Sequence, residues 1–448
     1  MIHSSKKNIV LTFLLFLLVL ECISQDSATV SKIKYYTKKA EKYLDKEKLL
    51  SPYYSINTNG ISIYDSPQNK VKDSFEFHIG LDKIDDFNSC IKKCSSQQVF
   101  EAYTKREYDM MNPGVTAVDI NLIKNDPQLA NDSLSHPEGV KKLKGVKVAI
   151  DAGHIAGDME MGNIEKKCLT FKCDSIAGLV DSIAIAEGAL TFATAVLLKD
   201  KLEAEGANVF MTRPFNNSSA FGVTFDSWLE TNYRNSVDSL YKIGKLTLSQ
   251  KQFFLSAKAT KRDKFRVIFK DVDLQKRAEI INNNKPDITI IIHYNVDETN
   301  TGWTKPANKN FNMAFVGGAF MKNDLSTPEK RFEFIRLLIS NDLEKSIELS
   351  SLMVQSFEKN LKVKTATIND AIYLREGCLP TGKPGVYCRN LQLTRYIHSP
   401  LVYGETLYQD NKMECKALNK ECEKIKNSRV QQVAEAYFQG VLKYMEKQ

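Results

Sequence analysis

The sequence predicts an α/β fold in which a mostly parallel sheet is flanked by helices. Three consecutive stretches carry this prediction: an apolar run at Val146–His154, a long helical pattern from about Ile183 to Glu205, and a second run at Asn208–Arg213. The first run is β-branched and ends abruptly in polar residues, as a buried parallel strand does. Strand, helix and strand in this order form a βαβ unit, which implies a parallel sheet.

The rest of this region continues the same pattern. Gly206 ends the long helix as a C-cap glycine, and a second helical pattern leads through a turn at Lys285–Asp287 into another buried strand. The further elements that we expect are a helix at Leu274–Ile281, strands at Ile288–Asn295, Met313–Val316 and Pro400–Glu405, and helices at about Asn341–Asn360 and Val430–Lys447.

The chain of 448 residues has room for two or three domains, or for one large domain with insertions. We expect a signal peptide over residues 1–24 and an N-terminal region with a linker over 25–140. This region begins with a Lys-rich helical stretch, continues as a small β-rich unit at Tyr53–Leu81, and ends in a polar linker at Gly114–Gly139. The α/β domain then covers residues 141–448, with insertions near 214–271 and 298–370.

The N-terminus predicts export. Lys6 and Lys7 precede an apolar run at Ile9–Leu20, which fits a secretory signal and is short for a membrane span. Cleavage after Ser24 would leave a periplasmic or extracellular protein. Lipid attachment at Cys22 is the less favoured alternative, because Glu21 precedes it where a small residue is expected.

Eight cysteines remain after removal of the signal, and they fall into four close pairs. Local disulfides suit such pairs in an oxidising compartment, whereas reduced thiols in a large domain are the alternative. The pairs are Cys90 with Cys94, Cys168 with Cys173, Cys378 with Cys388, and Cys415 with Cys422.

The formal charge of +8 fits an acidic polymer as a partner but does not identify one. The sequence contains no Arg-rich arm and no nucleic-acid-binding motif, so we expect no nucleic acid partner. The content of 43% hydrophobic and 26% charged residues is ordinary for a soluble globular protein.

Two histidines and two glutamates form a candidate metal site. His154 and His293 each end an apolar strand, and ligands bind at the carboxyl edge of such sheets. Glu187 opens the long helix and faces the same edge, and Glu405 lies just past the last strand as a candidate general base. Each residue also has a structural interpretation: a hydrogen-bonded histidine, a carboxylate complementing a helix dipole, or a loop carboxylate.

The motif Val148–His154 resembles the opening of the zinc-dependent N-acetylmuramoyl-L-alanine amidases. Three further segments resemble this family in the family's order, over roughly Lys144 to the C-terminus with interruptions. They are Glu187–Arg213, Leu274–Asn295, and the pair Gly385–Leu391 and Pro400–Glu405. The resemblance of all four segments in this order is a specific signal of the family, whereas the resemblance of any one of them would not be.

The resemblance implies one zinc ion per chain, bound by His154, Glu187 and His293, with Glu405 as the catalytic acid/base. The implied reaction is hydrolysis of the amide between N-acetylmuramic acid and L-alanine in peptidoglycan. Two further residues are candidates for substrate binding, Arg389 and Asn295, although Arg389 could equally form a structural ion pair. Asp151 is expected to orient His154 or its loop rather than to bind metal.

This chain departs from the family pattern in several places. Ile155 stands where the family has a glycine after the first histidine, and Tyr294 replaces a small residue after His293. Glu165 is a rival to Glu187 as the acidic ligand. The two insertions could roof or gate the site, which would restrict the substrate or require an activator protein. Two other functions stay open: a non-catalytic peptidoglycan-binding protein, and a zinc peptidase acting on cell-wall peptides.

Overall fold

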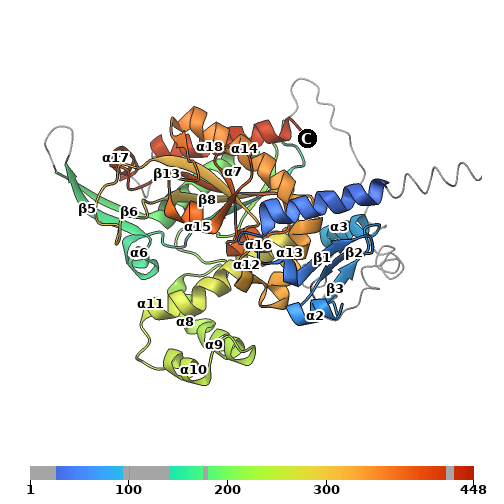
Figure 1. Ribbon diagram of the computed structural model, residues 1–448. Coiled ribbons are helices and arrows are strands. Elements are labelled where there is room, and N and C mark those ends of the chain that lie inside the picture. Colours follow the sequence, from blue (N-terminus) through green and yellow to red (C-terminus); the bar gives the residue numbers. More distant parts are fainter. Residues whose placement is uncertain (1–26, 94–99, 101–140, 175–179, 420–427) are drawn as a thin grey trace, which may run out of the picture. The chain divides into compact units, whose positions relative to one another are not determined.

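The computed structural model describes residues 27–93, 100, 141–174, 180–419 and 428–448 (Figure 1). The expected signal peptide, with Cys22, and the expected linker at 114–139 lie outside these residues. The chain forms two compact units, one of residues 1–128 with 320–340, the other of residues 129–319 with 341–448. Within the described ranges, no helix has the length and apolar character needed to span a membrane.

The first unit contains a small antiparallel sheet of three strands, β1 (Tyr54–Asn57), β2 (Gly60–Ile63) and β3 (Phe77–Ile79), in the order β1-β2-β3. Gly60 follows the turn between β1 and β2 with a φ of 142°, and a Cβ there would lie 2.1 Å from the carbonyl oxygen of Ile79. Only glycine fits so close to the neighbouring strand. The β-rich unit predicted from Tyr53 to Leu81 is therefore confirmed.

Helical segments complete the first unit, and one of them comes from residues 320–340. Helix α13 has a continuous buried stretch from Arg331 to Ile339, and Arg331 pairs with Glu76 at 2.6 Å. The Lys39 ammonium also donates to the Ser340 carbonyl oxygen at 2.6 Å. The segments are a helix over 27–39, η1 (Ala40–Leu44), η2 (Ser51–Tyr53), α2 (Pro67–Val71), α3 (Ile84–Lys93), η5 (Lys322–Leu325) and α13 (Pro328–Ile339).

The second unit is built on a mixed sheet with the strand order β11-β12-β9-β13-β8-β4-β7, and β10 pairs with β9. Most neighbouring strands are parallel, but β13 runs antiparallel to β9 and β11 antiparallel to β12. The predicted mostly parallel sheet is confirmed. The strands are β4 (Lys147–Ala152), β7 (Asn208–Met211), β8 (Ile288–Asn295), β9 (Phe311–Val316), β10 (Lys364–Thr365), β11 (Cys378–Pro380), β12 (Val386–Arg389) and β13 (Leu401–Tyr408).

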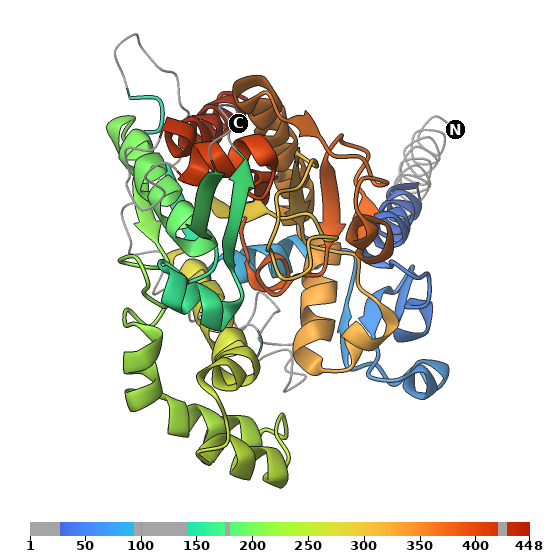
Figure 2. The ribbon, with the colours of Figure 1, turned by 90° about the vertical axis from the view of Figure 1, so that its left-hand side faces the viewer.

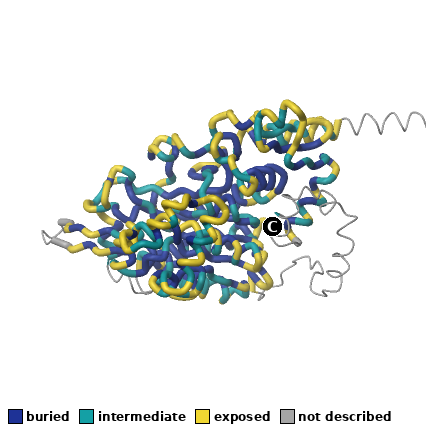
Figure 3. The backbone as a smooth tube through the Cα atoms, turned by 90° about the horizontal axis from the view of Figure 1, so that it is seen from below, coloured by how far each residue is buried: buried dark blue, intermediate teal, exposed yellow. Residues whose placement is uncertain are grey.

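Helices cover both faces of this sheet. On one face, α7 (Glu187–Ala204), α14 (Asp342–Leu361) and α18 (Ser428–Met445) pack together, and Tyr437 of α18 donates to the Gly404 carbonyl oxygen of β13 at 3.2 Å. On the other, α12 (Lys270–Asn284) and α16 (Gln392–Tyr396) share an apolar cluster with Ala149 and Ile291. Figure 3 shows the buried residues gathered in the interior of the trace. The sheet is therefore the middle layer of three.

The segment after β4 differs from the prediction. A loop was expected up to about Ile183, but the chain forms α6 (Met159–Glu165) and a hairpin of β5 (Cys168–Asp174) and β6 (Val180–Ala186). The predicted helix therefore begins at Glu187. Ile183 and Ile185 are buried while Ser182 and Ala184 are exposed, so this stretch alternates as a strand does. A short apolar run in a sequence fits a helix as well as a strand. Here the pairing with β5 makes this run a strand.

The polar insertion at 214–271 folds as a group of helices around its own apolar core, below the sheet in Figure 1. Trp228 is fully buried in this core, which also includes Ile155 and Ala156 from the segment after β4. The helices are α8 (Phe225–Thr231), α9 (Tyr233–Lys242), α10 (Leu248–Leu255), α11 (Lys261–Lys264) and η4 (Phe265–Phe269); α15 (Ile372–Gly377) and α17 (Lys412–Asn419) lie later in the chain.

The predicted disulfides are not confirmed. Three of the four pairs have a member outside the described side chains: Cys94, Cys173 and Cys422. Both members of the fourth, Cys378 and Cys388, are buried on the neighbouring strands β11 and β12, and no disulfide bond joins them.

Candidate active site

His154 lies two residues past the end of β4 and is held at the edge of the sheet by its backbone. Its φ of 56° is left-handed, which turns the chain sharply after the strand. The preceding Gly153 donates its N–H to the Ile292 carbonyl oxygen of β8 at 2.9 Å. A Cβ at Gly153 would lie 2.2 Å from the His293 ring, so glycine allows the two histidines to approach. Their ring centroids are 4.8 Å apart.

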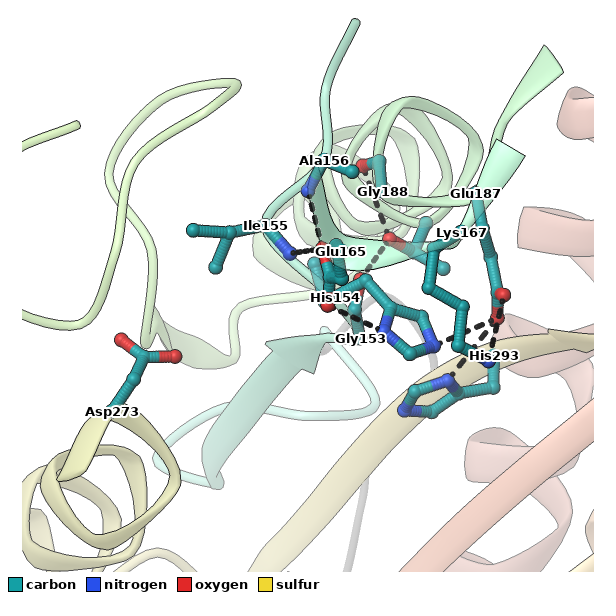
Figure 4. Close-up of polar contacts among 12 residues, drawn as sticks. Gly153, His154, Ile155, Ala156, Glu165, Lys167, Glu187, Gly188, Asp273 and His293 are labelled. Atoms are coloured by element: carbon teal, nitrogen blue, oxygen red, sulfur yellow. Dashed lines mark hydrogen bonds and ion pairs between the residues drawn. The ribbon is translucent and has the colours of Figure 1, made fainter. Parts of the chain in front are cut away.

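Glu187 is the first residue of α7, where a carboxylate is stabilised by the free N–H groups of the helix. Its side chain is buried, and its Oε1 atom lies 3.4 Å from His154 Nε2 and 3.3 Å from His293 Nδ1 (Figure 4). Its Oε2 atom lies 3.6 Å from the Lys167 ammonium. One oxygen therefore faces the histidines and the other faces a lysine.

His293 lies in β8, and its ring is sandwiched at the edge of the sheet. Tyr403 of β13 stacks on it with a centroid distance of 4.4 Å and an interplanar angle of 6°. Burial lowers the pKa of His293 to about 4. The ring is therefore neutral at physiological pH, the form in which a histidine nitrogen can bind a metal.

The three side chains of His154, Glu187 and His293 fit a divalent metal. One ligand atom from each lies within 4.8 Å of the others. Two imidazole nitrogens and one carboxylate oxygen are a donor set that zinc prefers, and three protein ligands leave a position open for water. The Oε1 atom of Glu187, which faces both histidines, is the carboxylate oxygen placed to complete this donor set.

Electrostatics keep this carboxylate ionised. Burial alone would raise the pKa of Glu187, but His154 and Lys167 outweigh it and hold the pKa well below its usual range. For His154, burial lowers the pKa, but the carboxylates of Glu187 and Glu165 raise it above its ordinary value. The cluster therefore attracts positive charge, either a proton or a metal ion.

Glu165, the rival acidic ligand, lies on the far side of the His154 ring. Its Oε1 atom accepts a hydrogen bond from His154 Nδ1 at 2.7 Å, and its Oε2 atom accepts the N–H groups of Ile155 at 3.1 Å and Ala156 at 3.0 Å. Both carboxylate oxygens of Glu165 therefore accept hydrogen bonds on the side of His154 that faces away from Glu187. This is the arrangement of a carboxylate that orients a metal-binding histidine.

Glu405 stands on β13 beside the cluster, in register with His293 of β8. The strand continues to Tyr408, so Glu405 lies within it and not past its end as predicted, because β13 pairs with β8 and β9 on both sides. Its Oε2 atom is buried and has no hydrogen-bond partner among the described residues. Burial and the charge of Glu187 raise the pKa of Glu405 to about 8.

A cleft of about 750 Å³ connects these residues. Its lining includes the three clustered side chains, Glu405 and both predicted substrate-binding residues. The Arg389 guanidinium lies 4.9 Å from the Phe315 ring centroid and 4.8 Å from that of Tyr373. The Asn295 amide donates to the Tyr373 hydroxyl at 2.8 Å.

Asp151 also lies near the cleft but is held by protein groups. Its carboxylate accepts a hydrogen bond from the Thr212 hydroxyl. It also accepts one from the Arg277 guanidinium, whose Nη1 atom lies 3.2 Å from Asp151 Oδ1. Arg277 also donates to the carbonyl oxygens of Ala152 at 2.9 Å and of His154 at 3.5 Å. Asp151 thus acts on the His154 segment through Arg277.

Sequence reasoning missed Lys167 and Trp303. The Lys167 ammonium lies 4.8 Å from the Trp303 ring centroid, and both residues line the cleft. Trp303 has a left-handed φ of 56° in the loop after β8. Neither belongs to a sequence motif, and the only available signal was that Lys167 is two residues from Glu165.

A sheet edge that gathers two histidines and a buried glutamate beside a second glutamate defines a candidate metal-dependent hydrolase site. Residues 148–443 match the sequence model of the N-acetylmuramoyl-L-alanine amidases, and this match covers more than half of the chain. The chain belongs to this family. Its function is that of a peptidoglycan amidase, which hydrolyses the amide between N-acetylmuramic acid and L-alanine.

Several solved amidase structures are similar to this chain at low identity. The CwlD amidase from Clostridioides difficile, in complex with the GerS lipoprotein, is 18% identical over 68% of this chain and 100% of its own, with a TM-score of 0.37. The Ami1 amidase from Mycobacterium abscessus is 18% identical over 67% and 99%, with a TM-score of 0.35. Ami1 from Mycobacterium smegmatis is 14% identical over 68% and 99%, with a TM-score of 0.38. No curated protein matched.

Proposed function

We propose that this amidase is zinc-dependent, with His154, Glu187 and His293 as the metal ligands and Glu405 as the catalytic acid/base. One observation carries the proposal: three ligand atoms lie within 4.8 Å of one another in the same cleft as a buried carboxylate with a raised pKa. If each of these residues had only a structural role, their side chains would have no reason to meet at one place.

When bound, zinc would polarise the scissile carbonyl and make a water molecule acidic enough to act as a nucleophile. Glu405 accepts the proton of the attacking water and returns it to the amine of L-alanine as the amide breaks. In the metal-free protein, burial and the charge of Glu187 raise the pKa of Glu405 to about 8. A cation bound beside it would favour the ionised form, in which the carboxylate can take up a proton.

Two neighbours position the ligands in this proposal. Glu165 fixes the tautomer of His154, because a proton on Nδ1 leaves Nε2 free to bind metal. Lys167 pairs with the Oε2 atom of Glu187 and leaves Oε1 for the metal side. Lys167 thus holds one carboxylate oxygen of Glu187 on the side away from the histidines.

Arg389 is proposed to bind a carboxylate of the stem peptide. The rings of Phe315 and Tyr373 hold its guanidinium in the cleft, and a planar guanidinium suits a carboxylate. Asn295 is the second proposed contact, although its amide group already donates to Tyr373. These contacts would orient the peptide side of the scissile bond.

The two other functions differ in what they leave after digestion. A non-catalytic binder would release nothing, and a cell-wall peptidase would cut within the stem peptide. The presence of Glu405 beside the ligand cluster favours catalysis over binding alone. An exported location, local disulfides and an activator protein stay proposals that rest on the sequence.

Mass spectrometry of digested peptidoglycan tests the reaction. We expect the purified chain to contain about one zinc per molecule and to release intact stem peptides that begin with L-alanine. A Glu405→Gln variant should keep its zinc and lose activity by about 10²–10⁴-fold, whereas the exposed control Glu279→Gln should match the unaltered enzyme. Peptides cut internally, or full activity in the Glu405→Gln variant, would contradict the proposal.

A further inference from the structure

One segment of the helical insertion carries positive charge without negative charge. Between Asp238 and Asp263 the sequence has six Lys and Arg residues and no acidic residue. Most of these side chains are exposed, including Lys242, Lys245 and Lys258. A cluster of one sign on a small segment creates a local positive potential that favours an anionic surface.

The same segment exposes large apolar side chains. Four of the eight such side chains that are exposed in the described part of the second unit fall within residues 241–253. Their exposed fractions are 38% for Tyr241, 64% for Ile243, 56% for Leu248 and 41% for Phe253. Such clustering marks an interaction site, whereas scattered exposed residues do not.

These exposed residues are not the result of loose packing. Leu246 and Phe254, their immediate neighbours, are 7% and 5% exposed and lie in the core of the insertion. Lys251 of α10 pairs with Asp238 at 2.7 Å and lies 4.8 Å from the Tyr241 ring centroid of α9, which fixes the two helices together. The segment is therefore an ordered surface with apolar and basic groups.

The geometry of the turn leaves this surface open. Gly244 has a φ of 73° between α9 and α10, and no heavy atom lies within 4 Å of the position where a Cβ would be. Figure 2 shows α8 to α11, in yellow-green, projecting at the bottom of the view, away from the sheet of the same unit. We call residues 241–258 the helical tip.

We propose that the helical tip docks this amidase on an anionic lipid surface. Lysines beside exposed Ile, Leu and Phe side chains are the pattern of segments that lie in a membrane interface. Anionic sugar polymers would pair with the lysines but would leave Ile243, Leu248 and Phe253 in water. Lipid headgroups and acyl chains satisfy both kinds of group.

Co-sedimentation with vesicles tests the proposal on the purified chain. We expect binding to vesicles of phosphatidylglycerol and phosphatidylethanolamine, and little binding to phosphatidylcholine. The triple variant Lys242→Gln, Lys245→Gln, Lys258→Gln should weaken binding by on the order of 100-fold, since each lysine contributes about fivefold near an anionic surface. The variant Ile243→Ser, Leu248→Gln, Phe253→Gln should weaken it by about tenfold or more.

Matched controls come from exposed residues elsewhere in the same unit. Met413→Gln removes an equally exposed apolar side chain, and Lys362→Gln with Lys364→Gln and Lys383→Gln removes equal charge. Both controls should bind vesicles as the unaltered chain does. All variants should retain their melting temperature and their hydrolysis of soluble peptidoglycan fragments, which separates docking from folding and catalysis.

A second readout reports insertion directly. An Ile243→Trp variant should shift its fluorescence to shorter wavelength with anionic vesicles and be quenched by brominated lipids. Absence of vesicle binding, or equal binding to neutral vesicles, would overturn the proposal. Binding that depends on the lysines but not on Ile243, Leu248 and Phe253, and that heparin abolishes, would also overturn it and indicate a polyanion. Binding of a protein partner by the helical tip, without binding of vesicles, would likewise overturn the proposal.

Discussion

The Nδ1 atom of His154 donates a hydrogen bond to Glu165 over 2.7 Å, and the opposite nitrogen of the ring then faces Glu187. Glu165 also accepts two backbone N–H groups from the segment after His154, so it fixes the ring and the turn together. Glu165 and Glu187, the two acidic ligand candidates in the sequence, therefore lie on opposite sides of the His154 ring.

A Glu165→Gln variant should bind zinc about 10–100-fold more weakly, because the amide orients and polarises His154 less well than a carboxylate. Isothermal titration with zinc measures this directly. The exposed control Glu160→Gln lies on the same helix and should leave the affinity unchanged. An unchanged affinity in Glu165→Gln would show that the hydrogen bond has no orienting role.

The raised pKa of Glu405 makes the stability of the metal-free protein depend on pH. The carboxyl of the unfolded chain has a pKa of about 4.3, whereas burial and Glu187 raise the folded pKa to about 8. Between these values the unfolded state ionises first, so the group destabilises the folded state increasingly as pH rises, and fully above about 8.

Glu405→Gln should therefore stabilise the metal-free protein at pH 9, by at most about 5 kcal/mol, and by progressively less as the pH falls toward 4.5. Urea denaturation in the presence of a chelator at several pH values checks this dependence. A constant difference between the two proteins across this range would contradict the assigned pKa.

The buried ion pairs of Arg277 should be important for stability. Arg277 lies 3.2 Å from Asp151 and 2.8 Å from Asp273, and all three side chains are buried. Arg277→Met should cost about 3–5 kcal/mol, because it leaves two buried carboxylates without their cation. The adjacent Lys276→Met should cost less than about 0.5 kcal/mol. Chemical denaturation of both variants measures the difference, and equal costs would refute the argument.

Ile155 connects the helical insertion to the proposed metal site. It follows His154 directly, is 1% exposed and lies in the same apolar cluster as Trp228 and Phe265. Ile155→Ala should destabilise the protein by about 2–5 kcal/mol and also weaken zinc binding, because the turn that carries His154 loses its anchor. Leu246→Ala lies in the same core far along the chain from His154, and should affect stability alone. Equal zinc affinity in both variants would exclude the connection.

The sequence by itself determined the parallel strands that carry His154 and His293, because buried parallel strands are continuous apolar runs whose ends are visible as polar residues. It also predicted the helix that carries Glu187 and ends before Gly206, although the pattern placed the start of this helix near Ile183. The carboxyl ends of parallel strands share one edge, so convergence of these three residues could be expected. The structure brings them together, and their metal-binding role stays a proposal.

Tertiary structure alone decided the contacts between segments distant from one another in the sequence. Pairing of β6 with β5 set the start of α7, and pairing of β13 on both sides placed Glu405 within a strand. The side of His154 on which Glu165 lies, and the contact of Lys167 with Glu187, depend on how α6 and the hairpin fold back on β4. Periodicity reports which face of an element is buried but not which partner buries it, so these relationships arise only when the chain is packed.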